Sequence, residues 1–267
     1  MRIKIFWAFI RQSFYNSAVY RFEFWLQIIS IFLMMYSVYW LWSILYTQSP
    51  GSFDVSLEQM RTYGILGMAL ETIFAPSFGP QKYISNQIRS GLIDADLIKP
   101  IDFQFHMIAR NFGELSFRAC TLVFPALIVG FLFLELRFPS SLENGIFFIV
   151  SILLGYLVLF SLNFMLGMLA MIILNINSIS WAYSAVIRFF AGQFIPLWLF
   201  PKFLSHLADL FPFKCIYYIP LSIYIGKLDR VEALHSIALQ FIWVTVLFAI
   251  SRIAWLKLQG KLVVQGG

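Results

Sequence analysis

Side chains able to do acid–base, nucleophilic or metal chemistry are few in this sequence and lie far apart. The three histidines are His106, His206 and His235, and the two cysteines are Cys120 and Cys215. This spacing does not predict a shared metal site or a proton relay. The patterns HExxH, GxSxG and GxxxxGK[ST] do not occur, which excludes peptide hydrolysis by those routes and nucleotide binding by a P-loop. We therefore expect no catalytic, metal or cofactor-binding residue in the chain.

Charged residues gather instead at 81–114, QKYISNQIRSGLIDADLIKPIDFQFHMIARNFGE, where four basic and four acidic residues nearly cancel. A lipid-binding patch carries one sign of charge. Ile84, Ile88 and Leu92 share one helical face, and Pro100 is expected to end the helix. A short helix with mixed charge and apolar anchors suits docking into a groove of a partner protein. An amphipathic loop resting on the membrane is the equal alternative.

The composition places most of the remaining residues in a membrane. The chain is 60% hydrophobic and 19% aromatic with only 12% charged residues, more apolar than a soluble core of this length. Its apolar runs are continuous rather than alternating, which predicts an all-α membrane protein and not a barrel. We expect one domain, 1–267, with six transmembrane helices at about 24–46, 60–80, 115–134, 145–174, 180–200 and 233–256.

Basic residues set the orientation of these spans. Thirteen of the 19 Lys and Arg residues fall on the side of the N-terminus, the C-terminus and residues 81–114. Since positive charge favours the inner side, both termini and the 81–114 loop are expected in the cytoplasm.

Residues 1–22 are expected to form an amphipathic helix in the membrane interface, because apolar side chains recur there at helical spacing. A plain basic lead-in to the first span is the alternative. The apolar positions are Ile3, Phe6, Ile10, Phe14 and Ala18.

Glu71 lies in the middle of the second expected span, and ionisable residues within membranes are functional candidates. It is either a substrate or proton site, or a residue facing a wet cavity or a polar partner such as Asn163. Arg188 is expected to reach the cytoplasmic headgroups. A lone acid without a charge partner argues against ion-coupled transport.

The apolar segment 192–227 is interrupted by Pro196, Pro201, Pro212 and Pro220. Interior prolines break helices, and irregular backbone survives at membrane depth only where protein or water shields it. We expect short re-entrant helices on the outer face before the last span.

Three stretches resemble one family. Residues 88–100 read I-x-S-G-x-I-x-x-x-L-x-x-P, residues 191–226 combine AGQFIPL with FP, LFPF and IYIG, and the chain ends in LVVQGG. Together they resemble the permeases of bacterial type-2 ATP-binding-cassette (ABC) exporters, in particular an uncharacterised six-span subgroup. The sequence departs from the family at Leu92, where an acid is usual, and at Lys99, where arginine is usual.

The resemblance implies a transport subunit of the bacterial cytoplasmic (inner) membrane that is not itself an enzyme. It implies two permease subunits, identical or homologous, with two ATPase subunits that bind ATP and Mg²⁺. Nucleic acid is not expected as a partner. A coupling helix in the 81–114 loop is expected to sit in a cleft of the ATPase, with the N-terminal helix bracing that interface. Its expected coupling residues are Arg89, Ser90, Gly91, Ile93, Asp94, Asp96, Leu97, Lys99 and Pro100.

The same resemblance implies that spans two and five line the path, with Glu71 and Asn163 as candidate path residues. The outer gate is expected at Phe194, Pro196, Pro201 and Pro212. The expected activity is export of an amphipathic or apolar substrate. An energy-independent channel or secondary transporter is the alternative, and a membrane enzyme acting on lipid is a third.

Overall fold

The computed structural model describes residues 2–17, 21–49, 51, 53–74, 79–99, 101–173 and 176–259, and these form helices with no strand among them. The helices are α1 (Arg2–Ser17), α2 (Arg21–Gln48), α3 (Leu57–Phe74), α4 (Pro80–Arg89), α5 (Ile93–Leu97), α6 (Phe103–Arg118), α7 (Phe124–Phe133), α8 (Leu142–Met168), α9 (Asn177–Phe190), α10 (Lys202–Leu210), α11 (Tyr218–Tyr224) and α12 (Arg230–Gln259). A π-helical turn η2 (Ala119–Val123) joins α6 to α7, and three short 3₁₀ helices are η3 (Leu169–Met171), η4 (Leu197–Leu199) and η5 (Pro212–Cys215). The all-α prediction is confirmed.

Four helical segments are long and apolar enough to cross a bilayer. They are Trp25–Gln48, Phe103–Phe133, Leu142–Met171 and Arg230–Gln259. They correspond to the first, third, fourth and sixth expected spans. The chain is therefore a multi-pass membrane protein.

The second and fifth expected spans correspond to α3, with 18 residues, and α9, with 14 residues. At about 1.5 Å per residue, α9 extends about 21 Å, less than the roughly 30 Å of bilayer hydrocarbon. The expected helix at 180–200 is wrong in its second half, because α9 ends at Phe190.

The third span begins earlier than expected, at Phe103 instead of residue 115. Asp102 caps α6, because its side chain accepts hydrogen bonds from the backbone N–H groups of Gln104 and Phe105. The 81–114 segment is therefore α4, α5 and the first turns of α6 rather than a loop.

Pro125 lies inside this span and lacks the N–H that an α-helix needs. The π-helical turn η2 precedes it, and the helix continues past the proline without a break.

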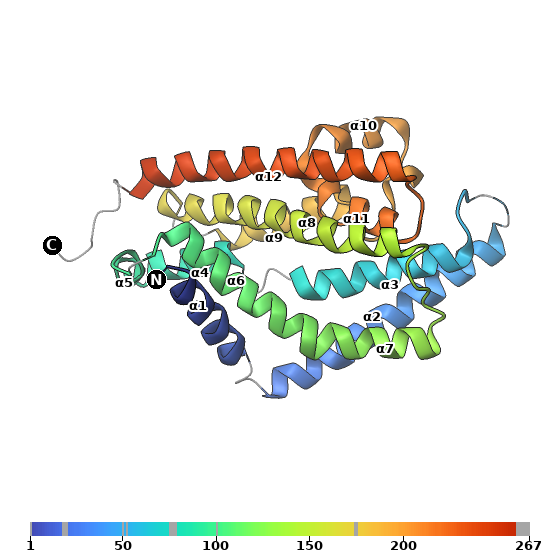
Figure 1. Ribbon diagram of the computed structural model, residues 1–267, viewed down its shortest axis with the longest axis horizontal. Helices are drawn as coiled ribbons and strands as arrows, with labels where there is room; N and C mark the ends of the chain where they lie inside the picture. The colour runs from blue at the N-terminus through green and yellow to red at the C-terminus, as the bar shows by residue number, and fades with distance from the viewer. Residues whose placement is uncertain are drawn as a thin grey trace.

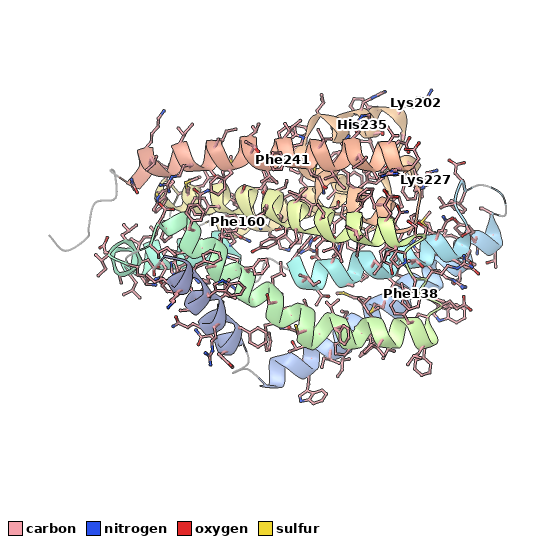
Figure 2. All side chains as sticks on the ribbon, viewed as in Figure 1. Phe138, Phe160, Lys202, Lys227, His235 and Phe241 are labelled. Carbon is pink, nitrogen blue, oxygen red and sulfur yellow. The ribbon has the colours of Figure 1, made fainter. Side chains whose placement is uncertain are left out.

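The helices form an elongated bundle with two distinct ends (Figure 1). The α5 end carries α5, the beginning of α1 and the last turns of α12, where Trp255 stacks on Phe103 with ring centroids 4.4 Å apart. The α10 end carries the α2–α3 and α7–α8 connections with α10 and α11. Figure 2 shows Phe138, Lys202 and Lys227 at this α10 end.

Short helices fill residues 197–224 at the α10 end, and each expected proline precedes or begins one of them. Pro196 and Pro201 are the N-caps of η4 and α10, Pro212 starts η5, and Pro220 lies in the first turn of α11. A proline there costs little, because the first N–H groups of a helix have no intrahelical partner.

Gln240 anchors this region to the long helices. Its buried side-chain amide donates to the Ser151 carbonyl oxygen at 3.0 Å and to the Cys215 carbonyl oxygen at 2.7 Å. The Ser151 hydroxyl donates back to the Gln240 amide oxygen at 2.9 Å. The contact joins α8, η5 and α12 and requires a close approach at Gly155, where an added Cβ would lie 2.6 Å from the Cys215 oxygen.

We predict that Gly155→Ala lowers the thermal unfolding midpoint of the detergent-solubilised protein, because the new methyl group displaces η5 at a cost of about 1–3 kcal/mol. Gly145→Ala is the matched control. It lies in the same helix, where an added Cβ meets only Pro139 at 3.4 Å. Similar midpoints for the two variants would contradict the close packing of η5 on α8.

Candidate functional site

The corner between α4 and α5, residues 80–99, holds most of the predicted coupling residues. The expected single helix through Ile88–Pro100 is wrong, because α4 ends at Arg89 and Gly91 takes φ +70°. The Leu92 N–H bonds to the Gln87 carbonyl oxygen at 2.9 Å and the Gly91 N–H to the Ile88 oxygen at 3.2 Å. This pattern terminates a helix and favours glycine at the left-handed position. Pro100 lies outside the described residues.

Asp96 holds the corner together. Its buried carboxylate accepts hydrogen bonds from the Tyr83 hydroxyl at 2.6 Å, the Gln87 amide at 2.9 Å and the Lys99 ammonium at 2.6 Å. Burial alone raises the pKa of Asp96, but these hydrogen bonds outweigh it and bring the pKa below that of a free aspartate. The network is therefore present at neutral pH, and its stabilisation is lost only as the pH falls below about 4.

The corner exposes aliphatic side chains at the tip of the α5 end. Ile98 is 84% exposed and Leu92 56%, and Leu97 is exposed beside them. Arg89, Ser90 and Gly91 are also exposed, Asp94 and Lys99 are half-buried, and Ile93 is buried. Two acidic residues were predicted to contact the ATPase. Asp96 is buried inside the corner, where its carboxylate is already hydrogen-bonded, while Asp94 remains accessible to a partner.

Contacts tie the corner to α1 and α6, and α6 is tied to α12. The Lys99 ammonium lies 5.6 Å from the Phe9 ring of α1, and the Arg110 guanidinium of α6 lies 4.0 Å from the Tyr83 ring. Beside the corner, Arg252 of α12 pairs with Asp102 at 2.5 Å. A force on the corner would therefore reach α1, α6 and α12.

A second site lies inside the bundle, where the last turns of α3 and α9 meet. Arg188 of α9 pairs with Glu71 of α3 at 3.1 Å, and the Tyr217 hydroxyl donates to Glu71 at 2.6 Å. The expectations of a lone acid at Glu71 and of a headgroup contact for Arg188 are therefore wrong. Arg188 lies in the last turn of α9, because α9 begins only at Asn177 and ends at Phe190. The residues are far apart in sequence, so no local pattern could reveal the pair.

The ion pair balances the helix ends that converge there. Helix C-termini carry partial negative charge, to which Glu71 adds a full one. Arg188 supplies a positive charge, and Arg118 of α6 donates to the Thr72 carbonyl oxygen at 3.3 Å, in the last turn of α3. Sequence reasoning missed the role of Arg118.

Two small cavities adjoin this ion pair. One, of about 20 Å³, is lined by Glu71, Asn163, Ser184 and Arg188 with neighbouring apolar residues. The other, of about 30 Å³, lies towards α6 and is also lined by Asn163. Each has room for a water molecule or two. Glu71 and Asn163 thus share a polar pocket, as the sequence suggested.

The predicted gate residues occupy several short elements at the α10 end. Phe194 and Pro201 are exposed, whereas Pro196 and Pro212 are buried. Beside them the Tyr63 hydroxyl of α3 donates to the Gly192 carbonyl oxygen at 2.6 Å. This contact links the region to the helix that carries Glu71.

Within the described part of the chain, no group of three or more His, Cys, Asp or Glu side chains is placed to hold a metal ion. His106 lies in α6 against the Phe9 ring at 4.5 Å, His206 lies in α10, and His235 lies on α12 near the α10 end (Figure 2). The sites are therefore built from helix packing and ion pairs.

The chain is thus a polytopic helical bundle with a corner of short helices at one end and a partly buried ion pair inside it. The family model described as ABC-2 family transporter protein matches residues 32–266. The chain therefore belongs to this family of ABC transporter membrane subunits, in which ATP hydrolysis takes place in a separate subunit. A search of curated proteins found no match.

Asp96→Ala is predicted to loosen the corner, because it removes the acceptor of three donors at a cost of about 1–3 kcal/mol. Amide hydrogen exchange in residues 80–99 of the purified protein should become faster. Asp94→Ala is the control, since Asp94 is half-buried and its loss should leave exchange unchanged. Equal exchange in the two variants would show that Asp96 does not hold the corner.

The Glu71–Arg188 pair is expected to couple α3 and α9 energetically. In a double-mutant cycle of Glu71→Gln and Arg188→Gln, each single variant leaves a charge unpaired, so the coupling free energy should be about 0.5–3 kcal/mol. Unfolding midpoints of the four proteins measure it. The exposed Glu143–Arg230 pair, 2.9 Å apart, is the control and should give at most about 1 kcal/mol. Additive effects at Glu71 and Arg188 would refute the coupling.

Proposed function

We propose that this protein is the permease subunit of an ATP-driven exporter in a bacterial cytoplasmic membrane. Two such subunits, identical or related, would assemble with two ATPase subunits that bind ATP and Mg²⁺. Both termini and the α5 end would face the cytoplasm, which agrees with the excess of Lys and Arg predicted for that side. The cargo would be amphipathic or apolar.

The exposed aliphatic surface of the corner carries this proposal. Leu92, Leu97 and Ile98 are exposed in or beside α5, outside the four candidate spans. Figure 1 shows α5 at one end of the bundle. A cluster of exposed aliphatic side chains facing water marks a protein-binding surface. The Asp96 network keeps these side chains in place, so an ATPase cleft would receive a preformed projection rather than a flexible loop.

Motion of the corner would travel along the contacts described above. When ATP closes the ATPase dimer, a rigid-body shift of α4 and α5 would move α6 through Arg110, and α6 would move α12 through the pair of Asp102 with Arg252. α6 is also hydrogen-bonded to the last turn of α3 through Arg118. The shift would therefore reach the junction of α3 and α9, where Glu71 and Asn163 would line the transport path.

At the α10 end, Phe194, Pro196, Pro201 and Pro212 would form the outer gate. The hydrogen bond from the Tyr63 hydroxyl to the Gly192 carbonyl oxygen supports this role, because it links α3 directly to the segment that follows α9. A movement of α3 would therefore also move this segment. α3 would thus connect the path to the gate.

Ile98→Glu tests the docking surface. The carboxylate remains in water in the free permease, so the variant should insert and fold normally, while burying it in an ATPase cleft carries a large penalty. We expect at least about a tenfold loss of ATPase affinity and a matching loss of permease-stimulated ATP hydrolysis.

Leu142→Glu is the matched control, because Leu142 is 85% exposed at the α10 end. It should leave ATPase binding and stimulated hydrolysis unchanged. Wild-type stimulation by the Ile98→Glu variant would exclude the corner as the coupling surface. A wild-type permease that stimulates no ATP hydrolysis would favour an energy-independent channel.

A further inference from the structure

The apolar face of α1 is covered by protein rather than by lipid. Ile10 is only 9% exposed, and Phe9 and Phe14 pack edge-on against His106 and Phe117 of α6. At Gly113 of α6, an added Cβ would lie 2.4 Å from the Ile10 carbonyl oxygen. The predicted N-terminal helix is present as α1, and its apolar face packs against α6.

The opposite face of α1 carries a basic and aromatic stripe, formed by Lys4, Trp7, Arg11 and Tyr15. Their spacing of three or four residues puts them on one side of the helix. All four are exposed, Trp7 by 62% and Tyr15 by 58%, and the Arg11 guanidinium lies 5.6 Å from the Tyr15 ring. The sequence of α1, RIKIFWAFIRQSFYNS, contains no acidic residue.

We propose that this stripe binds phospholipids whose phosphate headgroups carry a net negative charge, in the leaflet at the α5 end. Its charge has one sign, unlike that of the corner, which carries both acidic and basic residues. Phosphate is the complement of Lys and Arg, and Trp and Tyr prefer the boundary between headgroups and hydrocarbon. The stripe therefore combines cationic side chains with interfacial aromatic ones, and both favour binding to an anionic membrane surface.

The position of α1 in the chain supports a lipid partner. α1 ends at Ser17, and the first candidate span begins at Trp25, so a few residues connect the helix to the bilayer. Trp25 is 63% exposed, as an interfacial tryptophan would be. In Figure 1, α1 lies obliquely beside the bundle, next to the beginning of α2. With its apolar face on α6, the stripe faces away from the bundle.

Lipid binding would give α1 a second contact besides α6. The Lys99 ammonium of the corner lies 5.6 Å from the Phe9 ring, on the inner side of α1. A helix held to headgroups on one face and to α6 on the other would anchor the region beside the corner. This inference concerns lipid alone and does not depend on the proposed docking of an ATPase.

The test uses the full chain in vesicles of phosphatidylcholine and phosphatidylglycerol in equal amounts, with one of the two lipids brominated at a time. Bromine quenches nearby tryptophan fluorescence. The chain has eight tryptophans, so the Trp7 signal is taken as the difference between the wild type and Trp7→Phe. We expect brominated phosphatidylglycerol to quench Trp7 more strongly than brominated phosphatidylcholine.

Removing the cations should abolish this preference. At about 1 kcal/mol for each Lys or Arg near an anionic surface, Lys4→Gln and Arg11→Gln should each lower the relative affinity for phosphatidylglycerol at Trp7 by about fivefold. Lys202→Gln combined with Lys257→Gln removes the same charge from exposed positions in α10 and α12, and should leave the preference unchanged.

Equal quenching of wild-type Trp7 by the two brominated lipids would overturn the proposal, as would an unchanged preference after both α1 substitutions. Quenching by neither lipid would place the stripe in water or against another protein, and would also overturn it. Normal quenching of the other tryptophans in each variant shows that the protein has inserted.

Discussion

The junction of α3 and α9 is the constraint around which the bundle is organised. Both helices end inside the protein, and hydrocarbon offers no water for the polar groups at their ends. Arg118 donates to the backbone oxygen of Thr72 in the last turn of α3, and backbone N–H groups of residues 191–193 bond the last carbonyl oxygens of α9. Arg188 and Tyr217 pair with the Glu71 carboxylate. Because these partners come from α9, α6 and the segment before α11, the junction brings together elements from distant parts of the chain.

The ends of α3 and α9 inside the bundle also explain why the candidate path residues, Glu71 and Asn163, lie beside these two shorter helices. A helix that stops inside the bundle leaves polar groups and small cavities where a long helix would bury only apolar side chains. Asn163 lines both cavities, one beside Glu71 and the other beside Arg118. The polar residues at this junction are thus the same residues that the proposed transport path would use.

The corner at the α5 end follows a different principle. Its backbone turns through the glycine at position 91, and a single buried carboxylate holds the two short helices together. Outward, it presents aliphatic side chains, whereas α1 beside it presents a basic and aromatic stripe. Neighbouring surfaces at one end of the molecule are therefore suited to different partners, a protein groove and an anionic lipid surface.

Composition and periodicity by themselves determined the helical membrane class, four of the expected spans, the break-up of the 192–227 segment and the location of the corner, because apolar length, proline and glycine act locally. The family was also readable from residues 88–100 and 191–226, and the match over 32–266 confirms it. Tertiary structure alone decided that Asp96 points inward while Asp94 stays accessible, that Glu71 has Arg188 as its partner, and that the apolar face of α1 meets α6. These are contacts between separate elements, and a side chain's neighbours across a helix interface depend on packing that no local pattern in the sequence specifies.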